Sequence, residues 1–207
     1  MGKILRVLVA LLVLTTTTVA APVMEPREVV QSAVARVLTV VRDSAAADEP
    51  ARAVAERRRG EIRNIARDLF DFEDMARRTL SRHWATRSPR ERREFVALFE
   101  DLLVRSYVNR IEVYAGESIT YPGDIIDGSY AVVKSRVALR PNAEVALDYR
   151  LHLRDGRWRV YDVVVEGVSF VSNYRSEFDR IIQASSYASL VDRLRRKRIT
   201  VSLTDPS

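Results

Sequence analysis

Apolar residues in the first half of the chain recur at intervals of three and four, the spacing of amphipathic helices. Residues 26–42 show this spacing, with Pro26 suited to the first turn. Similar apolar stripes predict a second helix over residues 51–70 and a shorter one over residues 71–84. The chain therefore opens with three predicted helices.

The clearest helical pattern follows a capping box. Ser88 and Glu91 stand three residues apart, with Pro89 at the first helical position. From Phe95 to Ile111, apolar and aromatic residues then recur over about five or six turns. This pattern predicts a long helix with a continuous apolar face.

From about Glu117 the period changes to two, which is typical of strands. Asp-Gly pairs at 127–128 and 155–156 indicate two hairpins. Helical spacing returns after Gly167 and predicts two final helices. The expected fold class is α+β, with several helices packed on a four-stranded twisted antiparallel sheet. The predicted strands are residues 118–126, 130–139, 144–154 and 158–166.

The N-terminal segment has the form of an export signal. Lys3 and Arg6 precede an apolar run from Val7 to Leu14, and Val19-Ala20-Ala21 supplies the small residues of a cleavage site. The run is far shorter than the roughly 20 residues that span a bilayer. We expect a cleaved signal peptide over residues 1–21, a single domain over residues 22–207, and a soluble exported protein.

Composition narrows the chemistry. The chain has no cysteine and only two histidines, His83 and His152, so we expect no disulfide, no metal site and no cofactor. The formal charge of +6 falls to +4 without Lys3 and Arg6. Export argues against a nucleic-acid partner, and the modest excess of arginine does not identify another.

Three segments resemble the toluene-tolerance family, also called the MlaC family, of periplasmic phospholipid-binding proteins. They are Phe70-Asp71-Phe72-Glu73-Asp74-Met75-Ala76 with Trp84, the stretch Phe95–Leu103 with Tyr107, and Trp158–Ser169 followed by Asn173–Phe178. The resemblance implies a cone-like sheet similar to nuclear transport factor 2 (NTF2-like), with lipid held between sheet and helices. It also implies a monomeric periplasmic phospholipid shuttle in the pathway that maintains outer-membrane lipid asymmetry. The partners would be phospholipid as cargo, an inner-membrane ABC transporter complex with a lipid-binding ring domain, and an outer-membrane lipoprotein–porin complex.

The apolar faces of strands and helices supply the candidate lipid-binding wall. On the strands it comprises Val133, Val137, Leu147, Tyr149, Leu151, Trp158, Val160 and Val164. The facing helical residues are Phe99, Leu103, Tyr107, Phe170, Tyr174 and Phe178. The alternative is that these side chains simply fill their own core, in which case the protein would be a structural envelope protein without ligand.

A second alternative is an enzyme of the NTF2-like isomerase or dehydratase type, which needs a carboxylate base and a tyrosine donor in one pocket. The adjacent pairs Asp148-Tyr149 and Tyr161-Asp162 point to opposite faces of a strand. We therefore expect no catalytic residues.

Two further features have structural and functional interpretations. At the corner after the last predicted strand, Gly167 suits a sharp turn, Ser169 can cap a helix, and Glu166 can hold Arg175 or a backbone amide. The basic runs Arg57-Arg58-Arg59 and Arg193–Arg198 are either solvated helix faces or surfaces for anionic headgroups or acidic partners.

Overall fold

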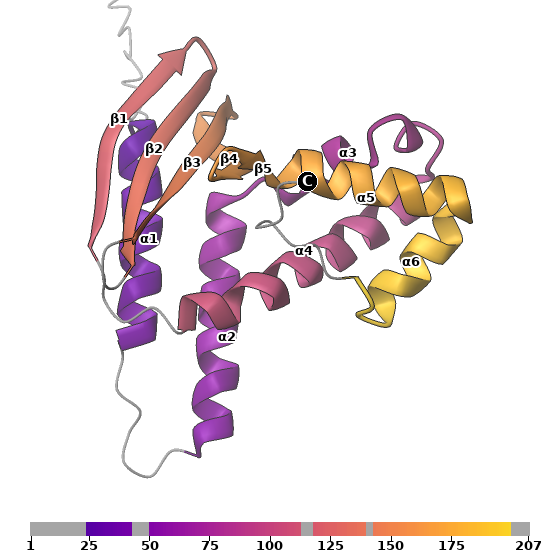
Figure 1. Ribbon diagram of the computed structural model, residues 1–207, viewed down its shortest axis with the longest axis horizontal. Coiled ribbons are helices and arrows are strands. Elements are labelled where there is room, and N and C mark those ends of the chain that lie inside the picture. The colour runs from indigo at the N-terminus through magenta and orange to yellow at the C-terminus, as the bar shows by residue number, and fades with distance from the viewer. Residues whose placement is uncertain (1–23, 43–49, 113–117, 140–142, 200–207) are drawn as a thin grey trace, which may run out of the picture.

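A computed structural model describes residues 24–42, 50–112, 118–139 and 143–199. Within them lie six α-helices, one short 3-10 helix and one sheet (Figure 1). The helices are α1 (Pro26–Arg42), α2 (Ala51–Leu69), α3 (Phe72–Leu80), η1 (Ser81–His83), α4 (Pro89–Glu112), α5 (Phe170–Ala184) and α6 (Tyr187–Arg195). The strands are β1 (Ile119–Asp127), β2 (Tyr130–Leu139), β3 (Ala143–Arg154), β4 (Arg157–Val165) and β5 (Val168–Ser169). The α+β class is confirmed, while the predicted signal peptide lies outside the described residues and stays a prediction.

Side-chain caps begin the helices where the sequence predicts them. In the capping box of α4, the backbone N–H of Ser88 donates to Glu91 over 2.8 Å, and the Glu91 N–H donates to the Ser88 hydroxyl over 3.3 Å. The Asp71 carboxylate accepts from the Asp74 N–H at the start of α3. Each cap satisfies a backbone donor that the first turn leaves without a partner.

The sheet is antiparallel with the order β1-β2-β3-β4-β5, so the prediction of four strands was wrong. The fifth strand is only two residues long, and it pairs Ser169 with Val164 and Val168 with Val165. It forms because the chain reverses at Glu166 and Gly167, both of which have positive φ. Two residues are too few to show a periodicity in the sequence.

A β-bulge in β4 changes which of its residues face the core. Arg150 of β3 pairs with Asp162, but its neighbour Leu151 pairs with Val160, so Tyr161 is the extra residue. Beyond the bulge, Val163 lies opposite Tyr149 and shares its face, whereas Val164 lies opposite Asp148. The strict period of two that placed Val164 on the same face as Val160 therefore fails at this point.

The core consists of two apolar clusters. In the sheet cluster, α1 packs against β1 and β2, α2 packs against β4, and Val133, Leu151 and Val160 are fully buried. In the helix cluster, α3, α4, α5 and α6 pack on one another beyond the β4–β5 edge (Figure 1). Phe70 and Phe170 pack against both clusters, so they mark the seam between the two halves of the core.

Candidate functional site

An apolar cavity of about 130 Å³ lies at the seam between the two clusters. Its wall is drawn from three helices, one strand and the start of α5, and every lining residue is aliphatic or aromatic. The lining residues are Ile62 and Ala66 of α2, Phe70, Phe72 and Met75 in and before α3, Leu103, Val104 and Tyr107 of α4, Val163 of β4, and Phe170 of α5. Among the residues that the structure describes, no charged side chain lines it. The cavity can therefore hold hydrocarbon, and its described lining contains neither the carboxylate nor the histidine that most acid–base catalysis uses.

Aromatic rings form much of the cavity wall. The rings of Tyr107 and Phe170 are stacked, with centroids 4.7 Å apart and planes at 23°. Phe70 and Phe72 are in tilted contact at 5.7 Å. Tyr107 and Phe170 are only half-buried, as are Ala66 and Phe70, so these parts of the wall lie near solvent.

Of the helical residues predicted to form the wall, some line the cavity and others lie elsewhere in the core. Leu103, Tyr107 and Phe170 line the cavity. Phe99, Tyr174 and Phe178 are fully buried deeper in the helix cluster, where their rings contact one another at centroid distances of 5.5 to 6.0 Å. Those three rings fix α5 against α4.

The predicted strand residues do not line the cavity. Val133, Leu151, Trp158 and Val160 belong to the sheet cluster, and Leu147 and Tyr149 pack against it. Val137 lies opposite Ile119 and Val145 towards the other end of β2, and Val164 faces away from Val163. α1 and α2 pack on the face of the sheet that carries the sheet-cluster residues. The assignment of the predicted strand residues as lipid contacts stays a prediction.

Sequence reasoning missed much of the wall, namely Ile62, Ala66, Phe70, Phe72, Met75, Val104 and Val163. One signal was available for α2, because Ile62 and Ala66 are four residues apart on its apolar stripe. No signal was available for Val163, because its orientation depends on the bulge.

Tyr149, one of the two tyrosine candidates for catalysis, is separated from its neighbouring carboxylate Asp148 by the sheet. Burial raises the pKa of Tyr149 well above its ordinary value despite a hydrogen bond with Ser135, so the phenol stays neutral. Asp148 lies on the opposite face and pairs with Arg136 at 3.7 Å. Within the described part of the chain, no cluster of histidine and carboxylate groups is arranged to hold a metal ion. No helix among the same residues is long and apolar enough to cross a membrane.

A comparison with known protein families shows to which family the chain belongs. Residues 31–196 match the family model described as MlaC protein. The chain belongs to the MlaC family. A solved structure of the phospholipid-binding protein from Ralstonia solanacearum, in complex with a phospholipid, superposes with a TM-score of 0.72. The two chains are 22% identical over 84% of this chain and 97% of that one, which shows a common fold.

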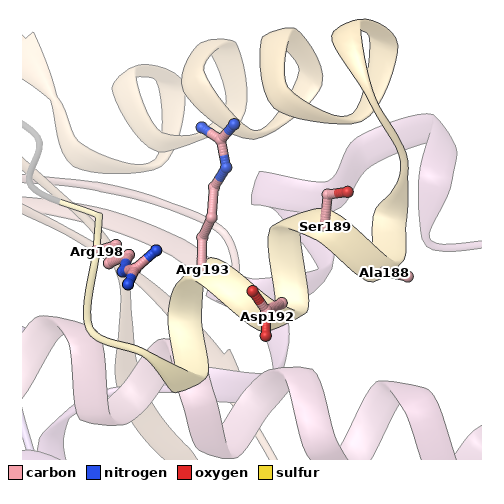
Figure 2. A pocket seen from close by; sticks show the side chains of 5 residues that line it. All are labelled: Ala188, Ser189, Asp192, Arg193 and Arg198. Carbon is pink, nitrogen blue, oxygen red and sulfur yellow. The ribbon is translucent and has the colours of Figure 1, made fainter.

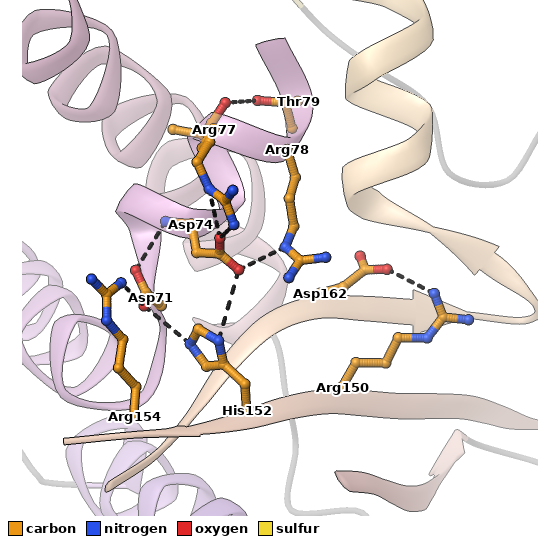
Figure 3. A network of polar contacts seen from close by, with 10 residues as sticks. Asp71, Asp74, Arg77, Arg78, Thr79, Arg150, His152, Arg154 and Asp162 are labelled. Atoms are coloured by element: carbon orange, nitrogen blue, oxygen red, sulfur yellow. Dashed lines mark hydrogen bonds and ion pairs between the residues drawn. The ribbon is translucent and has the colours of Figure 1, made fainter. Parts of the chain in front are cut away.

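The first MlaC-family motif, residues 70–76, attaches α3 to the sheet (Figure 3). Asp74, which is 3% exposed, accepts from Arg77 and from Arg78, the latter over 2.6 Å. Burial opposes ionisation of Asp74, but these bonds and charges outweigh it and hold the pKa of the carboxyl below its usual range. Asp71 contacts Nε2 of His152 on β3 at 3.1 Å. The network thus fixes α3, which carries Phe72 and Met75 into the cavity wall.

The third MlaC-family motif positions Phe170 through Asp162. This buried carboxylate accepts from the Ser169 hydroxyl over 2.7 Å, from the Val171 N–H over 3.0 Å and from Arg150 over 3.2 Å. Ser169 in turn caps α5, as the sequence predicts. Phe170 is therefore held between two anchored residues at the edge of the cavity.

The remaining prediction for this corner is also settled. Glu166 accepts a hydrogen bond from the backbone N–H of Ala146, which confirms the backbone-amide alternative. Arg175 donates instead to the Ser172 hydroxyl at 3.3 Å. The corner is a brace between β3, β4 and α5.

Proposed function

We propose that this protein is a phospholipid carrier that binds acyl chains in the apolar cavity at the seam and moves them through water without chemical conversion. The observation that carries the proposal is a cavity whose described lining residues are all aliphatic or aromatic. Membership of the MlaC family supports it. So does the common fold with a Ralstonia solanacearum protein that is in complex with a phospholipid.

The size of the cavity dictates how the lipid enters. Ligand sites typically have volumes of about 300–1,000 Å³, whereas this cavity has about 130 Å³. Acyl chains must therefore enlarge it by separating the helix cluster from the sheet cluster. The contacts that resist this separation at the cavity include the Tyr107–Phe170 stack, whereas Asp71 and Asp162, whose polar contacts join α3 and α5 to the sheet, are not among the described lining residues.

The energetics favour exchange with membranes. Burial of one methylene is worth about 0.8 kcal/mol relative to water, so an acyl chain gains on the order of 10 kcal/mol on entering the protein. Relative to a bilayer the gain is close to zero, because both environments are apolar. A carrier of this kind keeps its cargo while it crosses water and releases it to an acceptor without an energy source of its own. Such a carrier recognises the hydrocarbon chains of a lipid rather than its headgroup.

The proposal also covers the pathway in which the carrier would act. After removal of residues 1–21, the protein would act as a periplasmic monomer between an outer-membrane lipoprotein–porin complex and an inner-membrane ABC transporter complex with a lipid-binding ring domain. The carrier then has no catalytic residue and no cofactor, and phospholipid is its cargo.

The test is the lipid content of the protein from its own host. The protein is purified without detergent, and native mass spectrometry is combined with organic extraction and phosphorus analysis. We expect phospholipid in near-stoichiometric amount, and transfer of that lipid to acceptor vesicles. A folded protein that carries no phospholipid and takes none up from vesicles would refute the proposal.

A further inference from the structure

The end of α6 carries a surface depression of about 680 Å³ that is separate from the apolar cavity. Ala188, Ser189, Asp192 and Arg193 of α6 line it, together with Arg198 on the segment that follows (Figure 2). Figure 2 shows the two arginine side chains at one side of the depression and Ser189 and Ala188 at the other. The floor is thus polar, and its cations outnumber its anion.

The two arginines differ from their neighbours in having no carboxylate partner among residues 24–42, 50–112, 118–139 and 143–199. Arg195 pairs with Glu94, and Arg196 pairs with Asp192 at 2.8 Å. Arg193 and Arg198 make no such pair, and Arg198 is exposed at the chain segment after the helix. The pair with Arg196 also offsets the charge of Asp192, the one carboxylate in the depression.

The other basic run of the sequence is different. Arg57 pairs with Glu61 on α2, and Arg58 and Arg59 also have interaction partners. Of the two runs, the one on α6 therefore offers guanidinium groups whose hydrogen-bonding capacity is not already used by a carboxylate. Cations do suit a helix C-terminus, but Arg198 lies beyond the last residue of α6.

We propose that this depression is a binding site for a phosphate group, held by the guanidinium groups of Arg193 and Arg198 and by the hydroxyl of Ser189. A guanidinium presents a planar fork of donors that matches phosphate oxygens, and its charge strengthens each hydrogen bond. The Ser189 hydroxyl lies 3.1 Å from that of Ser186 and can donate either to it or to a bound anion.

The site is independent of the cargo cavity. α6 packs against the first turns of α4, where the Tyr187 hydroxyl donates to the Glu91 carbonyl at 3.3 Å. The cavity is lined by Leu103 and Tyr107, more than three turns further along the same helix, and no described residue lines both the cavity and the depression. The proposed phosphate is a second one beside that of the carried lipid, and it comes either from headgroups of a membrane surface or from free phosphate.

The experiment compares the full-length mature protein with two doubly substituted forms. Arg193→Gln/Arg198→Gln removes the proposed ligands, and Lys134→Gln/Arg157→Gln removes the same charge from the sheet, where neither residue forms an ion pair with a carboxylate of the described segments. Binding to phosphatidylcholine vesicles with and without phosphatidylglycerol is measured by flotation, and inorganic phosphate is titrated by NMR. We expect the first form to bind anionic vesicles at least ~10-fold more weakly than the control form.

A variant with the opposite expected effect distinguishes loss of the binding site from misfolding. Asp192→Asn removes the carboxylate found among the described lining residues of the depression, so phosphate binding should strengthen, which damage to the fold would not produce. Binding of inorganic phosphate without binding of anionic vesicles would support the site and assign free phosphate as its source. Equal losses in the two doubly substituted forms, or no loss in either, would overturn the proposal. Co-purified phospholipid should be unchanged in all forms, which separates this result from any failure of the carrier function.

Discussion

Filling the cavity at the seam with a side chain should displace lipid while the protein stays folded, and Ala66→Phe is the substitution that does so most directly. Ala66 lies on α2 with its side chain in the cavity wall. An apolar cavity of about 150 Å³ accommodates one benzene molecule, so one phenyl ring should occupy nearly all of the cavity of about 130 Å³.

The magnitude follows from the volume. Filling a void recovers about 24 cal/mol per Å³, which amounts to at most about 3 kcal/mol for this cavity. Strain from a larger side chain typically costs about 1–3 kcal/mol. The two effects nearly cancel, so the free energy of unfolding should change by less than about 2 kcal/mol. The lipid, in contrast, must compete with a ring that is covalently attached.

The assay counts lipid and stability together. Phospholipid per chain is measured by native mass spectrometry and by phosphorus analysis, and the free energy of unfolding by urea denaturation. Ala53→Phe is the matched control, because Ala53 is on the same helix but exposed. We expect the lipid content of Ala66→Phe to fall at least fivefold, with that of Ala53→Phe unchanged. A folded Ala66→Phe protein with the lipid content of the original would refute the placement of the cargo.

Three further substitutions test the wall and its supports. Leu103→Ala should cost about 2–5 kcal/mol and enlarge the cavity, so added phospholipid should raise its melting temperature more than that of the original protein; an equal rise would contradict the cavity assignment. Asp74→Asn should cost about 3 kcal/mol at pH 7. Because the folded-state pKa of Asp74 is lowered from 3.8, this difference should be lost as pH falls below 3.8 in urea titrations, and a pH-independent difference would be inconsistent with it. Ser169→Ala should cost about 1–2 kcal/mol by loss of the α5 cap, whereas Ser176→Ala, whose hydroxyl donates only to the Ser172 carbonyl within its own helix, should cost less than half as much in the same assay.

Most of the elements could be predicted because their signals are local. The capping box fixes the start of α4 through contacts within four residues, and the Asp-Gly turns fix two hairpins. The capping box depends on side chains next to the backbone groups that they satisfy, and the turns depend on residues that accept positive φ, so a single sequence contains the information. The resemblance to the family identified the same segments that now prove to attach α3 and α5 to the sheet.

The cavity could not be located in the same way, because its wall depends on how distant elements meet. Ala66 of α2 and Val163 of β4 are almost a hundred residues apart in sequence and face each other across one cavity. The bulge at Tyr161 then reverses the face of every residue after it. Continuing the period of two through β4 leads to Val164 instead of Val163. For the helices, the sequence correctly predicted Leu103, Tyr107 and Phe170 as part of the wall.

The small volume of the cavity is itself what a carrier of hydrocarbon requires. A permanent cavity of about 300–1,000 Å³ would cost about 7–24 kcal/mol at 24 cal/mol per Å³, which rivals or exceeds the 5–15 kcal/mol of net stability of a typical domain. A cavity of about 130 Å³ costs about 3 kcal/mol on the same scale. A seam lined by apolar side chains from separate helices can close on itself after the lipid leaves and open again around the next one, while the contact of Asp71 with His152 and the bonds to Asp162 keep α3 and α5 attached to the sheet. The polar contacts therefore hold the helices in place, and the apolar seam binds the lipid. Altering the polar contacts should change mainly the free energy of unfolding, and altering the seam should change mainly the lipid content.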